Sequence, residues 1–117
     1  MKIVVTAGGT MGHINPALAI IDEFKKHEKN LEVIYFGTHN RMEKDIIPKL
    51  GYRYIPLEIY GFSKDIVRDI KNVFLVKRAI QQVREVLRVE KPDVVIGVGG
   101  YVTYPVIMAA HKEHIKV

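Results

Sequence analysis

The sequence predicts an α/β protein with a doubly wound parallel sheet, and three observations support this. Short apolar runs rich in β-branched residues alternate with longer segments of helical periodicity. Two of these runs end in glycine pairs, Gly8–Gly9 and Gly99–Gly100. No linker, low-complexity tract or solenoid-type repeat interrupts the alternation. Such alternation is typical of parallel strands joined by right-handed helical crossovers in three layers.

The expected strands are short and rich in Val, Ile and Tyr. They cover residues 2–7, 31–37, 52–59 and 92–100, and residues 115–117 begin a fifth. The usual order of such a half, 3-2-1-4-5, places the first and fourth strands side by side, where ligands bind in open sheets. Because the chain stops within the fifth strand, residues 1–117 are expected to be one incomplete domain of a larger molecule.

The segments between the strands are expected to be helices. The first begins with Asn15 as N-cap and Pro16 at the first helical position, a pairing that favours a helix start. The third is capped by Ser63 or Asp65 and is expected to bend near Asn72. The expected helical ranges are 15–30, 41–51, 63–89 and 103–114.

The composition indicates a folded cytosolic protein. Of the 117 residues, 48% are hydrophobic and 26% are charged, which is ordinary for a globular domain. Cysteine is absent, which excludes disulfides and thiolate metal sites. The first apolar stretch is too short for a signal peptide or a membrane span, so no bilayer-crossing segment is expected.

Positive charge is concentrated in one region. The formal net charge is +5, and residues 64–91 contain eight basic and four acidic side chains. Such a stripe can face nucleic acid, an anionic membrane or water. Nucleic acid is disfavoured, because aromatic residues are not interleaved with the basic ones as base stacking requires.

A run of four apolar residues, 73–76, lies inside this basic region. At 100° per residue a helical run of this length spreads over about 300°, so one face of a core cannot bury all of it. With its basic neighbours the run resembles an interfacial patch that inserts among anionic headgroups. Burial under a neighbouring loop or a further domain is an equally weighted alternative. The expected membrane contacts are Val73, Phe74, Leu75, Lys77 and Arg78.

Two segments share one plan that suits an anionic ligand. In VVTAGGTMGHINPALAII and VVIGVGGYVTYPVIMAA, a strand is followed by Gly-Gly, a few small or polar residues, a proline and a helix. Glycine lets backbone N–H groups approach a ligand, and a helix start offers unpaired N–H groups with partial positive charge. Because the first and fourth strands are neighbours, both loops are expected to face one crevice and to suit a diphosphate or a sugar nucleotide.

His13 is the candidate catalytic base. It lies two residues before the expected N-cap, at the mouth of the crevice, where an imidazole could take a proton from an attacking hydroxyl. A loop histidine that bonds only backbone is the alternative. The remaining histidines have no metal-ligand partners at useful spacing, and no metal or cofactor is expected. Surface positions are expected for His27, His39, His111 and His114.

Other nucleotide-binding classes fit less well. A phosphate-binding loop of the Walker type needs Lys and Ser or Thr after its glycines, whereas Gly12 is followed by His13 and Ile14. The NAD fingerprint is incomplete, and the second strand ends without an acid for the ribose hydroxyls. Arg41 could serve an NADP phosphate. An NADP-dependent oxidoreductase fragment and a stand-alone nucleotide-binding module therefore remain as alternatives.

Four segments in register carry a resemblance to a known family. AGGTMGHINPALAI, GTHNRMEKDIIPKLGY, IYGF and KPDVVIGVGGYVTYPVIMAA resemble the amino-terminal domain of the MurG family, which belongs to glycosyltransferase family 28. The resemblance covers essentially the whole chain. It implies the Rossmann-like amino-terminal half of a two-domain GT-B glycosyltransferase, with the carboxyl-terminal, donor-binding domain absent.

The resemblance also implies an activity. Members of this family transfer N-acetylglucosamine from UDP-N-acetylglucosamine to the muramyl sugar of an undecaprenyl-diphosphate lipid, lipid I, in peptidoglycan synthesis. The transfer inverts the anomeric centre without a metal, at the cytoplasmic face of the cell membrane. By this likeness His13 is the base, and residues 73–78 face the membrane. The implied substrate-binding residues are Gly8, Gly9, Thr10, Met11, Gly12, Gly99, Gly100 and Tyr101.

Two positions depart from the family pattern. Met11 stands where the family has a glycine, and a positive φ there would strain the loop. Tyr104 replaces a small residue before Pro105 and is expected to narrow the acceptor cleft. Without the second domain, the chain is expected to be inactive alone.

Overall fold

The computed structural model describes residues 1–61 and 66–117, and within these it confirms an α/β fold with an all-parallel sheet. The expected caps Ser63 and Asp65 lie outside the described residues. The strands run in the order β3-β2-β1-β4. The elements are β1 (Lys2–Ala7), α1 (Met11–His27), β2 (Glu32–Thr38), α2 (Glu43–Lys49), β3 (Arg53–Leu57), α3 (Ile66–Glu90), β4 (Val94–Gly99) and α4 (Thr103–Lys112).

The sheet of the described residues has four strands, and the expected fifth is not formed. β1 lies in the middle, with Val5 opposite Tyr35 of β2 and Ile96 of β4. The last three residues have no strand structure, but the N–H of Val95 donates to the carbonyl of Lys116 at 2.8 Å. The chain end therefore lies beside β4, on the side where the order 3-2-1-4-5 places a fifth strand.

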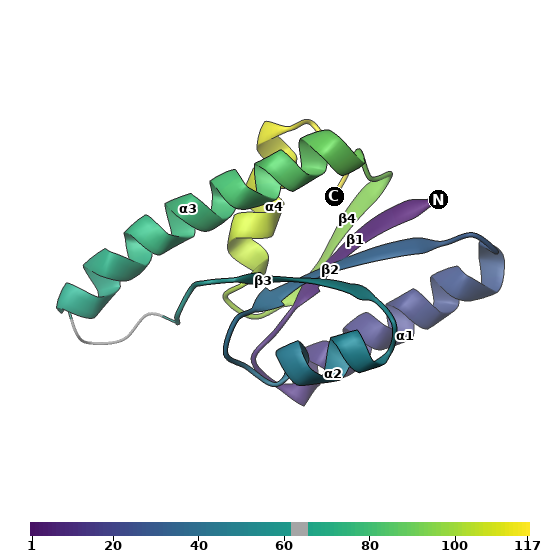
Figure 1. The fold of residues 1–117 in the computed structure, drawn as a ribbon, viewed down its shortest axis with the longest axis horizontal. Coiled ribbons are helices and arrows are strands. Elements are labelled where there is room, and N and C mark those ends of the chain that lie inside the picture. Colours follow the sequence, from purple (N-terminus) through teal and green to yellow (C-terminus); the bar gives the residue numbers. More distant parts are fainter. Residues whose placement is uncertain (62–65) are drawn as a thin grey trace.

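Helices cover both faces of the sheet, as Figure 1 shows, with α3 and α4 on one side and α1 and α2 on the other. The alternation of β1 separates the two cores. Val4 packs with the α3 and α4 side chains, whereas Ile3 and Val5 pack with those of α1. Both faces of β1 are buried, which explains why its sequence is a continuous apolar run.

Helix α1 begins five residues earlier than the Asn15–Pro16 pair indicates, which corrects that expectation. Thr10 is the N-cap, and Pro16 lies inside the helix. Pro16 removes one N–H donor, but the extra turn brings Ile14 into the core, where it is fully buried. Burying such a side chain stabilises the fold by about 1.5–3 kcal/mol, which offsets much of the roughly 3 kcal/mol that a proline inside a helix costs.

Helix α3 is one uninterrupted helix, and the expected bend near Asn72 is not formed. The Asn72 side chain is buried and bonds the loop after β3 instead of its own helix. Its Oδ1 accepts from the N–H of Tyr60 at 2.8 Å, and its Nδ2 donates to the carbonyl of Tyr60. The amino-terminal half of α3 projects beyond the sheet (Figure 1). No described helix combines the length and apolarity that a membrane span needs.

Candidate functional site

The two glycine loops are in direct contact at the carboxyl end of the sheet. The N–H of Gly8 donates to the carbonyl of Gly99 at 3.3 Å. Gly100 has a φ of 89°, and a methyl group there would lie 2.5 Å from the carbonyl oxygen of Gly8. Gly100 must therefore be glycine both for its conformation and for this close approach. The expected meeting of the loops follows from the pairing of β1 with β4.

His13 lies where the two loops meet, in the first turn of α1 rather than in a loop before it. Its Nδ1 is 3.1 Å from the carbonyl oxygen of Gly8. Because a carbonyl oxygen only accepts, Nδ1 carries the hydrogen in this bond, and Nε2 of the neutral ring is left as an acceptor. The ring packs against Gly99, where a methyl group would lie 2.6 Å from Cδ2.

The open amide groups of the first loop are those of Thr10, Met11 and Gly12, which have no hydrogen-bond partner within the described part of the chain. All three residues are exposed, and they form the start of α1, where the helix dipole favours an anion. The N–H groups of Gly8 and Gly9 are bonded within the protein, that of Gly8 to the Gly99 carbonyl and that of Gly9 to Glu43.

The Met11 position needs no glycine. Among the described residues, the non-glycine residues with positive φ are Lys91 and His114, so Met11 is unstrained. The positive φ of the first loop lies at Gly9, at 93°. A side chain at position 11 is compatible with the loop because α1 already begins there.

Glu43 is the functional candidate that the sequence did not reveal. Its side chain is completely buried, and Oε1 accepts from the N–H of Thr38 at 2.9 Å and from its hydroxyl at 2.6 Å. Oε2 accepts from the N–H of Gly9 at 3.2 Å. Burial, and then the charge of Glu43, raise the pKa of Tyr35 and of Tyr54. An acid at the start of a short helix is ordinarily an exposed partner of the helix dipole, so its sequence position did not indicate burial.

Two further side chains of the segment after β2 make contacts that sequence reasoning missed. The guanidinium of Arg41 donates through Nη2 to the carbonyl of Gly9 at 3.0 Å. His39 is half-buried rather than a surface residue, with Nε2 3.2 Å from the hydroxyl of Tyr60. His27, His111 and His114 are exposed, as expected. In the part of the chain that the structure describes, no three acidic or histidine side chains converge as metal ligands would.

An apolar cavity of about 570 Å³ adjoins the second glycine loop, between α3 and α4. Tyr101 of the loop and Tyr104 of α4 form one wall. Tyr104 is 57% exposed, so it extends this wall toward solvent. The other lining residues are Ile59, Tyr60, Val73, Val76, Lys77, Ile80 and Lys112.

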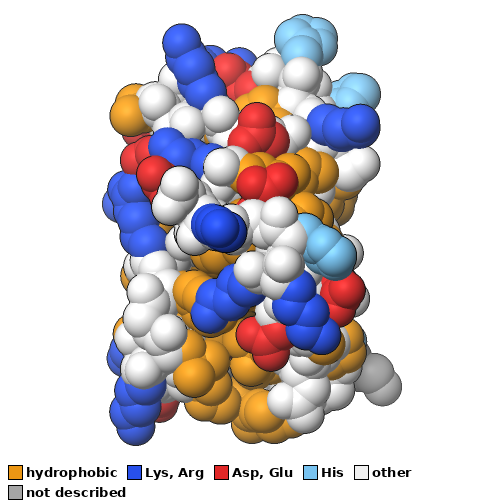
Figure 2. Space-filling view, turned by 90° about the vertical axis from the view of Figure 1, so that its right-hand side faces the viewer, with side chains coloured by type: hydrophobic (Ala, Val, Ile, Leu, Met, Phe, Trp, Pro, Cys, Tyr) orange, Lys and Arg blue, Asp and Glu red, His pale blue; other side chains and the backbone are white. Residues whose placement is uncertain are grey.

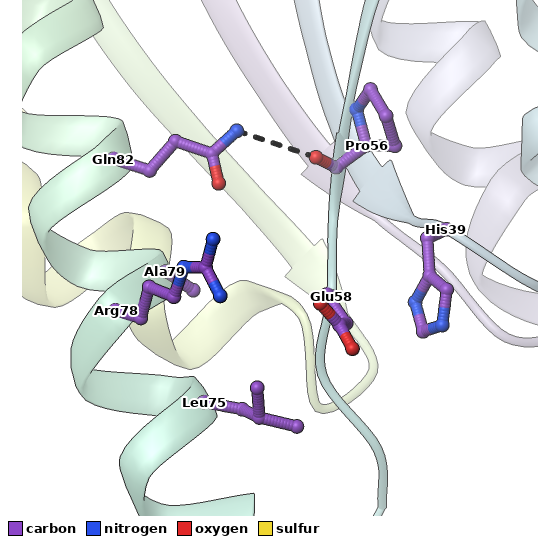
Figure 3. Close-up of a pocket in the computed structure, with 7 residues that line it drawn as sticks. All are labelled: His39, Pro56, Glu58, Leu75, Arg78, Ala79 and Gln82. Carbon is purple, nitrogen blue, oxygen red and sulfur yellow. Dashed lines mark hydrogen bonds between the residues drawn. The ribbon is translucent and has the colours of Figure 1, made fainter.

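A smaller cavity of about 270 Å³ lies between α3 and the end of β3 (Figure 3). Leu75 and Arg78 extend toward it from α3, and Glu58 and His39 border it from the opposite side. The Gln82 side chain reaches the carbonyl of Pro56 at 3.5 Å. Leu75 is therefore half-buried against this cavity and does not share the exposure of its neighbour Phe74.

The amino-terminal half of α3 exposes apolar side chains, as the run 73–76 indicated. Phe74 is 68% exposed, Ile70 56% and Val67 78%, and their spacing places them on one face of the helix. Val73 is 43% exposed beside them. Lys77 and Arg78 are exposed one turn further on. The expectation that part of this run points outward is confirmed.

The comparison with known families decides what kind of domain this is. Residues 3–117 match the family described as the glycosyltransferase family 28 N-terminal domain. The chain belongs to this family. Its relation to MurG, indicated by the four sequence segments, is confirmed by relatives and by a solved structure.

The proteins to which this chain is similar are longer than the chain itself. A protein of Halalkalibacterium halodurans named UDP-N-acetylglucosamine–N-acetylmuramyl-(pentapeptide) pyrophosphoryl-undecaprenol N-acetylglucosamine transferase is 45% identical over 113 residues, which are 96% of this chain and 31% of that protein. One of the same name from Bacillus licheniformis is 43% identical, with the same two shares covered. The crystal structure of Acinetobacter baumannii MurG matches with a TM-score of 0.82 and 27% identity, over 97% of this chain and 33% of that one. The chain thus spans about a third of the length of its relatives.

Proposed function

We propose that this chain is the acceptor-binding part of an inverting glycosyltransferase of peptidoglycan synthesis. The reaction transfers N-acetylglucosamine from UDP-N-acetylglucosamine to undecaprenyl-diphosphate-linked N-acetylmuramyl-pentapeptide, converting lipid I to lipid II. The relatives' names supply the reaction. The observation that supports this assignment is the meeting of two glycine loops around His13, at the carboxyl end of the sheet where open α/β folds bind ligands.

His13 is proposed as the general base. Nδ1–H is held by the Gly8 carbonyl, which leaves Nε2 to accept the proton of the acceptor hydroxyl. The hydroxyl oxygen then forms the bond to the anomeric carbon, and UDP leaves with the electron pair of the broken carbon–oxygen bond. Attack opposite the leaving group inverts the anomeric centre. The Gly8 carbonyl also stabilises the imidazolium that forms, because its bond to Nδ1–H strengthens with charge.

The two loops are proposed to bind the acceptor diphosphate between them. The unpartnered N–H groups of Thr10, Met11 and Gly12 supply donors and the positive end of α1. The residues Gly99, Gly100 and Tyr101 form the facing wall, just before α4. Gly8 and Gly9 contribute the shape of the loop rather than donors, and Thr10 to Gly12 also border the donor sugar.

The projecting half of α3 is proposed to contact the anionic cytoplasmic face of the cell membrane, to which the protein binds peripherally. Phe74 and Val73 supply apolar side chains, and Lys77 and Arg78 supply charge for lipid headgroups. Leu75 contributes from its half-buried position. An acceptor that carries an undecaprenyl chain has to be reached at such a surface.

The donor nucleotide is proposed to bind mainly to a second, carboxyl-terminal domain, because the chain spans only a third of its relatives. The chain alone is then inactive. The match to the glycosyltransferase family favours the transferase over the NADP alternative, and one N–H of the Arg41 guanidinium is already bonded to the Gly9 carbonyl. Nothing in the described residues favours a stand-alone nucleotide-binding module over the transferase.

A titration with inorganic pyrophosphate and with a lipid I analogue tests the assignment. We expect the amide signals of Gly12 and Gly100 to shift together, because both loops face the same diphosphate. Gly51, at the end of α2 and remote from the loops, serves as the internal control. Shifts confined to one loop, or equal shifts at Gly51, would contradict a diphosphate site between the loops.

A further inference from the structure

The geometry points to Glu43 as a positioning residue of the transfer site: we propose that its buried carboxylate holds the Gly8–Gly9 turn so that the Gly8 carbonyl meets His13 and the amides of Thr10 to Gly12 stay open. This inference rests on the proposed function for its catalytic consequence. Its structural part, the hold on the turn, stands on the contacts of Glu43 alone.

The carboxylate connects two loops that are far apart in the sequence. Oε1 takes both donors of Thr38, at the end of β2, and Oε2 takes the N–H of Gly9, after β1. The hydroxyl of Thr38 also accepts the N–H of Arg41 at 3.1 Å. Among the described residues, the groups that donate to Glu43 are thus neutral backbone or hydroxyl groups. A buried carboxylate bonded in this way fixes the geometry of its donors, since leaving any of them unpaired is costly.

The glycines around Glu43 leave the space that its side chain occupies. A methyl group at Gly8 would lie 2.5 Å from Oε1, and one at Gly37 would lie 2.7 Å from Cγ. Real side-chain carbons do not approach this closely, so the two positions and the carboxylate require one another. Gly8 therefore serves a purpose beyond the turn, because it admits the carboxylate that bonds its neighbour Gly9.

Gly9 is hydrogen-bonded through both its N–H and its carbonyl, and these bonds also orient the Gly8 carbonyl that contacts His13. Its N–H is bonded to Glu43 and its carbonyl accepts from the Arg41 guanidinium at 3.0 Å. The next residue back, Gly8, presents its carbonyl to Nδ1 of His13 at 3.1 Å. The peptide plane between Gly8 and Gly9 contains this carbonyl and the Gly9 N–H, so fixing one orients the other. Glu43 thereby controls which ring nitrogen of His13 carries the hydrogen.

The substitution Glu43→Gln tests this directly, because it keeps the shape and removes one acceptor. Its NH₂ group must face either the Gly9 N–H or the donors of Thr38, and two donors cannot bond. Tyr54→Phe is the matched control, since the Tyr54 hydroxyl donates to the Thr38 carbonyl at 2.7 Å without touching Gly9. It removes a hydrogen bond at the same end of β2.

The first readout needs no substrate. In the chain itself we expect Glu43→Gln to speed amide hydrogen exchange at Gly9 by about tenfold or more, as an opened local contact does. We also expect the ¹⁵N spectrum of the His13 ring to lose the preference for Nδ1–H. Tyr54→Phe should do neither. Unchanged exchange and an unchanged ring tautomer in Glu43→Gln would overturn the proposal.

The second readout is kinetic, in a transferase that carries this chain as its amino-terminal part. We expect Glu43→Gln to lower kcat by about tenfold or more with little change in KM, because misplacing a base by about 1 Å costs up to 10²-fold. A changed tautomer with unchanged kcat would overturn the positioning role. If the wild-type chain shows the Nδ1–H tautomer of His13 but supports no sugar transfer, the result counts against the proposed function. It does not affect the inference that Glu43 holds Gly9.

A second variant covers the case in which Glu43→Gln does not fold. Arg41 is exposed, so Arg41→Ala should fold, and it releases the carbonyl side of Gly9. We expect faster exchange at Gly9 and a smaller shift of the His13 tautomer in the same direction. Because Glu43 stays bonded to the Gly9 N–H in this variant, complete loss of protection at Gly9 would overturn the proposal by assigning the hold to Arg41.

Discussion

The two ends of the sheet differ in how their charged side chains are bonded. At the amino end, charges pair with charges: Glu90 accepts from Lys2 Nζ at 2.7 Å and from Arg53 Nη1 at 2.5 Å, which joins α3 to β1 and β3. Figure 2 shows this face, where basic and acidic side chains are interspersed. At the carboxyl end, the buried Glu43 is bonded by neutral donors and the start of α1 is left open.

The difference shows how a small domain separates stability from binding. Ion pairs at the amino end tie the elements together and leave little net field for a ligand. At the carboxyl end, neutral donors bond the buried Glu43, and the exposed N–H groups of Thr10, Met11 and Gly12 at the positive pole of α1 stay without a partner in the described part of the chain. An anion is therefore favoured at one end of the sheet and not at the other. Four predictions test this contrast, beginning with the largest expected effect.

His13→Ala should separate activity from stability most strongly. In a transferase that carries this chain, we expect kcat to fall by about 10²–10⁴-fold, the usual contribution of a general base. The melting temperature should change little, because the ring is only half-buried. His27→Ala, at the opposite end of α1 and exposed, is the control and should leave kcat unchanged. A near-wild-type rate in His13→Ala would mean that His13 only bonds the backbone and is not the general base.

Phe74→Glu should weaken binding to anionic vesicles by about tenfold or more, because it replaces an apolar contact worth about 1.5–3 kcal/mol with a repelled charge. Sedimentation with vesicles that contain phosphatidylglycerol measures the effect. Val89→Glu is the control, since Val89 is 79% exposed on the same helix but near the amino end of the sheet. If both variants lose vesicle binding equally, the two halves of α3 do not differ in membrane contact. If Phe74→Glu loses no binding, the proposed membrane contact is wrong.

Gly100→Ala should destabilise the fold by more than Gly51→Ala, as measured by urea unfolding. Both glycines have nearly the same φ, 89° and 88°, so both substitutions carry a left-handed conformational cost of about 1–2 kcal/mol. A methyl group at Gly51 meets no atom within 4 Å, whereas one at Gly100 meets the Gly8 carbonyl. The difference between the two variants thus measures the contact between the loops. Equal losses would show that the loops can separate at no cost.

The smallest effect concerns acid stability at the amino end. Hydrogen bonds from Lys2 and Arg53 hold the pKa of Glu90 below its ordinary value of 4.5. A lowered pKa in the folded state adds stability above pH 4.5 that is lost as the pH falls through the lower, folded value. Glu90→Gln should therefore flatten the acid limb of a plot of melting temperature against pH. The site is solvent-accessible, so the change in melting temperature should be small. An unchanged acid limb would mean that other carboxylates cause the loss of stability at low pH.

The sequence predicted those parts of the fold that depend on local pattern. The strands, their parallel order and the meeting of the two glycine loops follow from apolar runs, glycines and crossover rules. The predicted start of α1 was wrong: the Asn15–Pro16 pair is a good local start signal, but the helix begins at Met11 and its added turn buries Ile14. Local signals do not contain the packing energy that decides such a boundary.

The roles of Glu43 and His39 could not be predicted for a related reason. Each depends on partners far along the chain: Gly9 lies 34 residues from Glu43, and Tyr60 lies 21 residues from His39. Polar side chains beside a strand end look the same in sequence whether they face water or another loop. The pairing of β2 with β1 brings the end of β2 beside the first glycine loop, where Glu43 accepts from the N–H of Gly9.

The continuity of α3 has a mechanical consequence. Its 25 residues make a rod of roughly 37 Å at 1.5 Å per residue, with Phe74 toward one tip and Glu90 at the other. Under the proposed docking, the lipid surface contacts the amino-terminal half of α3, while Glu90 at the other end of the helix is bonded to Lys2 of β1 and Arg53 of β3. The height and tilt of the two glycine loops above the lipid headgroups would then depend on the stiffness of α3. A single proline in the middle of this helix should therefore lower the rate of sugar transfer while leaving membrane binding intact.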